Sequence, residues 1–450
     1  MLFLKGLSGV RILLYRGKMK LSRLFVKVGL LICIFVYIYS IHFRGVPFTS
    51  EFLLGLLGLG MIFYKWFINK SNSIIINGSF AKILLAMLAV ICVSILSLAC
   101  NSTSDIVFIK LMILNSITFA GAYFISLIIR KIYGTVEFAT IVKYVTIASC
   151  LQMIFSLCLF FIPNSTDIVF KVLNVSELQS NVMDSLEGFR LMGFGTTFFG
   201  AGVINSFVLI MIAGVMSSKK KSFWETFGYT FAFVLIGSVG MMMARTTMVG
   251  IGLALTLALY NSKFWKLIIS KKARDIFKTI FIIISVITII ILNLPPDILE
   301  LLDVIYNFGF EMFIKFFESG KLETRSTNAM FGMYIFPDNW KTWLIGDGYF
   351  ADPMDPEFLY YKGVDIGFIR MLFYFGGIGT FVFFLYQFII IYQTYKKNVN
   401  VGAALFVFVY ILFVVVNLKG FKDLFPLIIL FYFCSQNISK SIYKTKRDMN

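Results

Sequence analysis

Charge is scarce in this sequence. Of its 450 residues only 14% are charged, whereas 59% are hydrophobic and 17% are aromatic. Soluble globular domains usually carry about 25% charged residues, so this composition excludes that class. It indicates an all-α, polytopic membrane protein whose residues 1–450 form a single integral membrane domain.

Histidine and cysteine are also scarce, with one histidine and six cysteines. The cysteines lie at positions 33, 92, 100, 150, 158 and 434, within or beside apolar stretches, and no two form a Cys-x-x-Cys pair. This pattern predicts neither a disulfide framework nor a metal site. Internal repeats, low-complexity segments and a soluble domain are missing as well. We therefore expect no metal and no cofactor.

What the sequence has in abundance is apolar windows long enough to cross roughly 30 Å of hydrocarbon. They begin near residues 24, 51, 80, 106, 138, 191, 224, 246, 277, 364, 401 and 424. We therefore expect about twelve transmembrane helices, with the seventh and eighth divided at Arg245. The first window stays in the protein, because the segment from Ile41 to Arg44 that follows it has no small-residue cleavage site.

The charged residues predict the orientation of these helices. The formal net charge is +18, and the basic residues lie in short loops beside apolar windows. Most of the 41 lysines and arginines fall on the side of the amino terminus, and most of the 23 acidic residues fall on the opposite side. By the positive-inside rule both termini are cytoplasmic. The basic residues form no continuous stripe, so we expect no nucleic-acid partner.

Two long loops are then external, one over residues 163–190 and a larger one over 294–363, between the ninth and tenth helices. The larger loop opens with Pro295 and Pro296, after which Asp297 is the expected cap of a new helix. Apolar residues from Ile298 to Phe316 recur at helical spacing. This segment is predicted to be an amphipathic helix lying in the membrane interface.

Basic residues at the external ends of the helices are candidate anion-binding groups. They are Arg190, Arg245, Arg325, Arg370, Lys419 and Lys422. An arginine beside a helix amino terminus can hold a phosphate through two hydrogen bonds. Arg370 lies inside an apolar window, where an ionisable residue indicates a site. The competing interpretation for Arg190 is contact with lipid headgroups.

Carboxylates and aromatic rings in the larger loop complete the candidate site. Asp365 and Glu323 are candidate general bases, although Asp365 also fits the position of a helix cap. Trp343 and Tyr349 offer aromatic faces that suit sugar rings. A Trp/Tyr belt at the membrane interface explains the same two residues.

Taken in order, these motifs resemble a known family. Arg190-x-x-Gly opens the sixth window, Ala-Arg245-Thr follows a glycine-rich helix, and Arg325 precedes Trp343-Leu-Ile-Gly-Asp-Gly. Asp365-x-Gly and Phe375-Gly-Gly-Ile-Gly come next. The order resembles that of the Wzy-type polymerases, which join repeat units of O-antigen, capsule or exopolysaccharide and share a superfamily with the O-antigen ligases. The resemblance covers most of residues 185–430.

The resemblance implies a metal-independent membrane glycosyltransferase of the bacterial cytoplasmic (inner) membrane, acting on its outer face. Its partners would be a polyprenyl-diphosphate-linked oligosaccharide donor, a similar acceptor, the lipid bilayer and a chain-length regulator protein. Arg190, Arg245 and Arg325 match basic positions of the family. The resemblance does not decide between Asp365 and Glu323 as the base.

Two alternatives remain. Ligases of the superfamily are associated with a histidine in the long external loop, and here the only histidine is His42. A flippase or other transporter of lipid-linked oligosaccharides usually shows repeated halves and ionisable groups at mid-membrane depth. Lys65, Lys110 and Lys143 lie near the ends of their windows instead, so polymerase is preferred over both.

Overall fold

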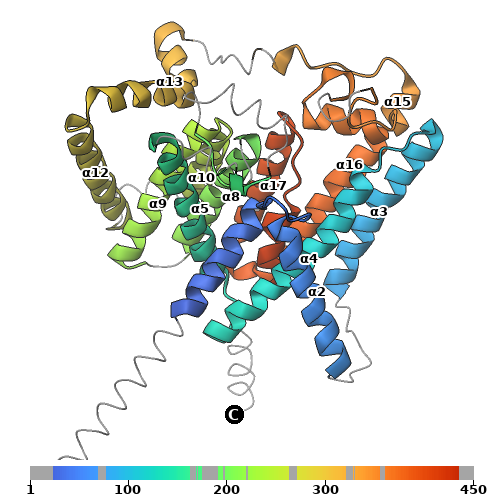
Figure 1. Ribbon diagram of the computed structural model, residues 1–450, viewed down its shortest axis with the longest axis horizontal. Helices are drawn as coiled ribbons and strands as arrows, with labels where there is room; N and C mark the ends of the chain where they lie inside the picture. The colour runs from blue at the N-terminus through green and yellow to red at the C-terminus, as the bar shows by residue number, and fades with distance from the viewer. Residues whose placement is uncertain are drawn as a thin grey trace, which may run out of the picture.

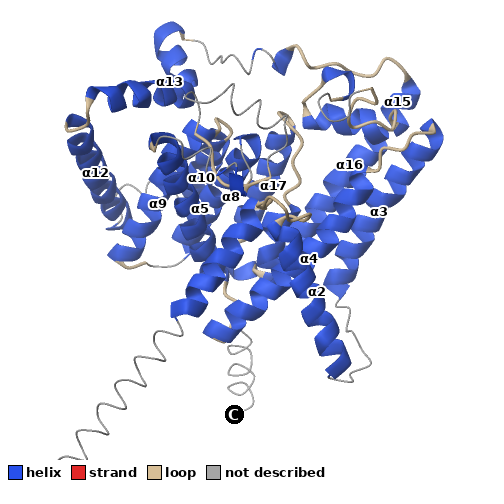
Figure 2. Cartoon of the chain, in the orientation of Figure 1, coloured by secondary structure: helices blue, strands red, loops and turns tan. Residues whose placement is uncertain are grey.

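The computed structural model describes residues 24–68, 78–162, 169, 171–174, 191–195, 198–218, 221–262, 271–320, 328, 330–354 and 360–434. Within these ranges the secondary structure is helical (Figure 2). The described residues form only isolated β-bridges, such as the one between His42 and Thr49. The prediction of an all-α fold is confirmed.

Eight helices of the described chain are long and apolar enough to cross a membrane. They are α2 (Ser50–Ile68), α3 (Gly78–Asn101), α4 (Val107–Tyr133), α5 (Phe138–Phe161), α8 (Phe198–Ser218), α9 (Phe223–Met243), α12 (Lys271–Leu292) and α16 (Gly367–Lys397). Three apolar helices are shorter: Leu24–Tyr39, α10 (Thr247–Ser262) and α17 (Ala403–Asn417). The chain is a multi-pass membrane protein.

The segment predicted as the twelfth span differs from the others in its described part. α17 ends at Asn417, and residues 418–424 are not helical. The short helix α18 (Phe425–Ile429) and the 3-10 turn η3 (Leu430–Phe433) follow. A turn is therefore present at 418–424, where the sequence predicted one between the last two windows, and helical residues follow it from Phe425 to Phe433.

Glycines set how closely the central helices pack. A Cβ atom at Gly58 of α2 would lie 1.9 Å from the carbonyl oxygen of Ala120 on α4, so only glycine fits there. Small residues give membrane helices this close backbone approach. In α16, Gly376 has φ +69° and breaks the helix. The carbonyl of Tyr374 that this break frees accepts a hydrogen bond of 3.0 Å from the backbone N–H of Gly348.

The same break docks α15 (Trp340–Ile345), which the sequence pattern did not predict, against α16. A Cβ at Gly376 would meet the carbonyl carbon of Leu344 at 2.2 Å. The larger loop is therefore partly folded onto the bundle. α15 lies close to α16 in Figure 1.

A helix, α13 (Pro296–Ser319), is present where the sequence predicted the amphipathic helix of the larger loop. The expectation that Asp297 caps it is wrong, because the capping position is Pro295 and no side chain caps this end. Pro296 at the first helical turn starts the helix by its fixed φ. In Figure 1, α13 turns away from the end of α12 and runs across the upper end of the molecule.

Turns far apart in the sequence meet at this end, called the loop end below. The backbone N–H of Arg44 donates to Val172 at 2.8 Å, and the Thr103 hydroxyl donates to the Gly348 carbonyl at 3.1 Å. The Tyr334 hydroxyl donates to the carbonyl of Leu418 at 3.3 Å. The last two bonds place the larger loop beside the turn before α4 and beside the turn after α17. The first joins the turn before α2 to the described residues 171–174.

Candidate functional site

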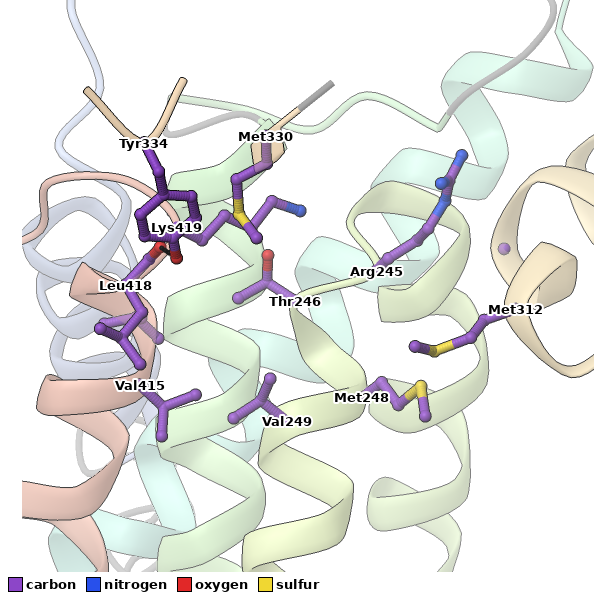
Figure 3. Close-up of a pocket in the computed structure, with 12 residues that line it drawn as sticks. Arg245, Thr246, Met248, Val249, Met312, Met330, Tyr334, Val415, Leu418 and Lys419 are labelled. Carbon is purple, nitrogen blue, oxygen red and sulfur yellow. Dashed lines mark hydrogen bonds between the residues drawn. The ribbon is translucent and has the colours of Figure 1, made fainter. Parts of the chain in front are cut away.

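A cavity of about 430 Å³ lies at the loop end between α10, α13 and α17 (Figure 3). Its lining is Arg245, Thr246, Met248, Val249, Gly309, Met312, Met330, Tyr334, Val415, Val416, Leu418 and Lys419. Most of these side chains are apolar. The two cations, Arg245 and Lys419, come from two different turns at the loop end.

Arg245 lies in the turn between α9 and α10, as predicted. Its Nη1 is 2.8 Å from Oε2 of Glu311 on α13, and its Nε donates to the carbonyl of Phe308 at 3.1 Å. Its guanidinium also lies 4.5 Å from the centre of the Phe308 ring. Gly309 makes this approach possible, since a Cβ there would be 3.2 Å from the backbone nitrogen of Met242. Arg245 therefore lines the cavity and ties α13 to the bundle.

Lys419 comes from the turn after α17. In Figure 3 its side chain extends above Thr246, while Met248, Val249 and Val415 lie lower in the cavity. The cavity thus has a polar, cationic mouth and an apolar body. That division suits a ligand with an anionic head and a hydrocarbon chain.

Arg370 lies in the first turn of α16 and is buried. Its guanidinium lies between two aromatic rings, 3.7 Å from the centre of Phe350 and 3.9 Å from that of Tyr360. Its Nη2 donates to the carbonyl of Phe350 at 3.3 Å. Stacking on both faces fixes the plane of this cation.

Asp365 lies near Arg370 and Lys419. Partial burial raises the pKa of the Asp365 carboxyl above its usual range, and the charges of Arg370 and Lys419 oppose that rise. The alternative that Asp365 caps α16 is wrong, because Ile366 occupies the capping position and no side chain caps this end. Gly367 brings these groups together, since a Cβ there would lie 2.7 Å from the carbonyl carbon of Gly420.

The two aromatic candidates lie away from the cavity lining. The Tyr349 ring stacks on Tyr361 with 5.5 Å between ring centres. Trp343 on α15 stacks on Phe336 at 6.0 Å and donates its indole N–H to the carbonyl of Pro337 at 2.8 Å. They border the same end of the bundle without contacting the cavity.

Three predicted residues, Arg190, Glu323 and Arg325, lie outside the described residues, as does most of the 163–190 loop. Lys422 is described but does not line the cavity. Its charge acts on Glu51 and Asp423 instead. The structure therefore brings Arg245, Lys419, Asp365 and Arg370 to one region and separates Lys422 from them.

Sequence reasoning missed these two buried carboxylates. Glu51 and Asp423 are each 7% exposed. Asp423 accepts hydrogen bonds from the side-chain amides of Asn115 and Gln387 and from the backbone N–H of Phe425. The available signal was a carboxylate at the start of an apolar window, which occurs at both positions.

No protein-family model, no curated protein and no solved structure matches this chain. Its function is therefore argued from the cavity and the groups around it.

Proposed function

We propose that this protein polymerises polyprenyl-diphosphate-linked oligosaccharide repeat units into a surface polysaccharide, on the outer face of the bacterial cytoplasmic membrane. The observation that carries the proposal is the cavity between α10, α13 and α17, with Arg245 and Lys419 at an otherwise apolar lining. We further propose twelve spans with both termini in the cytoplasm, which puts the loop end outside.

In this proposal the donor diphosphate binds at Arg245 and Lys419, and the polyprenyl chain leaves through the apolar body of the cavity. An acceptor hydroxyl attacks the anomeric carbon of the donor sugar, and the bond from that carbon to the diphosphate oxygen breaks. The developing negative charge on the diphosphate is stabilised by the two cations. Asp365, which lies near Lys419, takes the proton of the acceptor hydroxyl.

The positions of the other elements support this assignment. α13 carries an apolar stripe and the ion pair with Arg245, so it can lie in the interface beside the lipid-linked substrate. Trp343 and Tyr349 border the loop end, where the glycan of an acceptor would extend. The motif order over residues 185–430 resembles the same class of enzyme. A chain-length regulator would contact this end of the protein.

Transport of lipid-linked oligosaccharides is the second candidate. It is favoured by one observation, the buried carboxyls of Glu51 and Asp423, on both of which the charge of Lys422 acts. Ionisable groups inside a helix bundle mark the substrate and ion pathways of transporters. The cavity, with its cationic mouth and apolar body, is consistent with both candidate functions. Ligation has no separate observation in its favour.

Deleting the gene for this protein in its native strain distinguishes polymerase, ligase and flippase, because each blocks a different step. Loss of a polymerase leaves single repeat units that still reach their final acceptor. Loss of a ligase leaves long polymer on its lipid carrier, and loss of a flippase leaves single lipid-linked units at the cytoplasmic face. Full-length polymer in the deletion strain would overturn the proposal.

Chelation is a second, biochemical test. Because Arg245 and Lys419 supply the positive charge at the diphosphate, polymerisation of lipid-linked substrate by purified protein is expected to survive a chelator of divalent cations. Activity lost in chelator and restored by added magnesium would contradict this mechanism.

A further inference from the structure

Glu311 on α13 lies between two cations. Its Oε2 is 2.8 Å from Nη1 of Arg245, and its Oε1 is 2.8 Å from Nζ of Lys315, one turn further along α13. Each carboxylate oxygen therefore serves one cation. Arg245 lines the cavity, so the arginine proposed to bind an anionic headgroup is already paired with a carboxylate of the protein itself.

A phosphate oxygen would bind Arg245 in the way that Glu311 does. Charge-assisted hydrogen bonds to a guanidinium have the same form for carboxylate and phosphate oxygens. The Nε of Arg245 donates to the carbonyl of Phe308 at 3.1 Å, and its guanidinium lies 4.5 Å from the centre of the Phe308 ring. These contacts fix the guanidinium, so the carboxylate occupies a position that suits an anionic oxygen of a ligand.

Packing keeps Glu311 within reach of this position. Ile305 on α13 is fully buried, and a Cβ at Gly309 would lie 3.2 Å from the backbone nitrogen of Met242 on α9. Gly309 and Met312, on either side of Glu311 in sequence, both line the cavity. A group tethered in this way acts at a high effective concentration. Glu311 is therefore placed to compete with an anion that enters the mouth of the cavity.

The ion pair can open without leaving a charge buried and uncompensated. The side chain of Arg245 is 18% exposed and that of Glu311 is 19% exposed, so both reach solvent. When Glu311 leaves Arg245, its other oxygen can keep Lys315, whose side chain is 44% exposed. The large cost of separating an ion pair applies where one charge stays buried without a partner. Exchange of Glu311 for another anion at Arg245 is therefore accessible.

We propose that Glu311 is an intramolecular competitor of the anionic headgroup for Arg245. The ligand is taken to be a lipid diphosphate, and in this the inference rests on the proposed function. Headgroup and carboxylate exclude each other, so the apparent affinity is reduced by the fraction of protein in which Glu311 has released Arg245. The same competition weakens binding of the lipid diphosphate that the reaction releases, and so limits retention of this product.

Ligand binding to purified full-length protein in phosphatidylcholine nanodiscs tests the competition. The probes are farnesyl diphosphate and farnesol, which share a hydrocarbon chain and differ in the anion. Glu311→Gln is expected to bind farnesyl diphosphate about tenfold more tightly than the native protein, a gain of ~1.4 kcal/mol, and to bind farnesol equally. Glu318→Gln, the same change at an exposed position of α13, is expected to match the native protein with both probes. Native affinity of Glu311→Gln for farnesyl diphosphate, or no binding of this probe, overturns the proposal.

A double-mutant cycle shows whether the competition takes place at Arg245. In the Arg245→Ala background, Glu311→Gln is expected to change the affinity for farnesyl diphosphate by less than about twofold, because the shared partner is gone. A general repulsion between Glu311 and the anion would instead give the same gain in both backgrounds. Equal gains would therefore refute competition for Arg245.

Thermal unfolding gives an independent readout through linkage. Without ligand, the native protein is expected to unfold at a higher temperature than Glu311→Gln, because only the native chain has the ion pair. Saturating farnesyl diphosphate replaces this pair, so the difference should vanish, whereas farnesol should leave it. A difference that persists at saturation contradicts the proposal. These experiments measure binding and not polymerisation, so failure of the proposed function in the deletion strain is distinguishable from failure of this inference.

Discussion

Lys419 and Lys422 lie three residues apart in one turn, yet they occupy opposite environments. Lys419 lines the amphipathic cavity together with Arg245. The charge of Lys422 instead acts on the buried carboxyls of Glu51 and Asp423. At the cavity, Arg245 pairs with Glu311 and Lys419 lies near Asp365.

The difference follows from burial. An interior charge must find compensation inside the protein, because water is excluded. At the cavity mouth, water and ligands are accessible, so a cation there needs less compensation from the protein. Recognition of an anionic headgroup requires such accessible cations. Substitutions in and around the two environments test this difference.

The interior charges are tested by removing Lys422. Lys422→Met removes the positive charge that acts on the buried carboxyls of Glu51 and Asp423, and a buried charge left without compensation costs roughly 3–5 kcal/mol. We expect little folded protein, measured by size-exclusion chromatography and thermal unfolding. Lys419→Met, the matched change in the same turn, is expected to remain folded. Equal behaviour of the two variants would show that burial does not separate them.

Asp365→Asn tests the base assigned to the cavity side. We expect polymerisation to fall about a thousandfold, because a general base contributes 10²–10⁴-fold. Since partial burial raises the pKa of Asp365, the ionised and active fraction of the native protein falls as pH drops through a value above the usual aspartate range of about 4. Measuring the polymerisation rate as a function of pH shows this decrease at low pH. Asp338 is an exposed residue of the same loop, and Asp338→Asn should keep the native polymerisation rate and its decrease at low pH.

Arg245→Ala removes a cation from the mouth of the cavity. The barrier to loss of the diphosphate is expected to rise by roughly 3 kcal/mol, on the order of a hundredfold in rate. Arg245→Lys should recover only part of this activity, because Arg245 holds Glu311 and Phe308 through its planar guanidinium. Single-turnover rates at matched protein level report the effect. A parental rate for the alanine variant would remove Arg245 from the mechanism.

Lys315→Ala is the mildest change. Lys315 pairs with Glu311 at 2.8 Å one helical turn away, on the same helix and half-exposed. Such exposed pairs contribute about 0.3–0.5 kcal/mol, so thermal unfolding should change by no more than about 1 °C. Glu311→Gln should be more severe, because Glu311 also holds Arg245. If Lys315→Ala and Glu311→Gln lower the unfolding temperature equally, the ion pair between Glu311 and Arg245 adds nothing to stability.

The helices of this protein follow from local sequence patterns. Windows of apolar residues predicted the long helices, and the apolar stripe after Pro295 and Pro296 predicted α13. The same local reasoning placed Arg245 in the turn between α9 and α10. These features depend on residues close together in the chain, so periodicity and helix-stopping residues are sufficient to predict them.

Which of these residues lie together depends on how the helices pack. Glu311 reaches Arg245 because α13 folds back onto α9, and Asp365 lies near Lys419 because Gly367 packs on Gly420. The docking of α15 at the Gly376 break of α16 likewise became visible only in the fold. Pairings between distant segments depend on backbone close approach and on the balance of buried charge. Neither feature leaves a periodic pattern in the sequence, because both arise only when the helices pack.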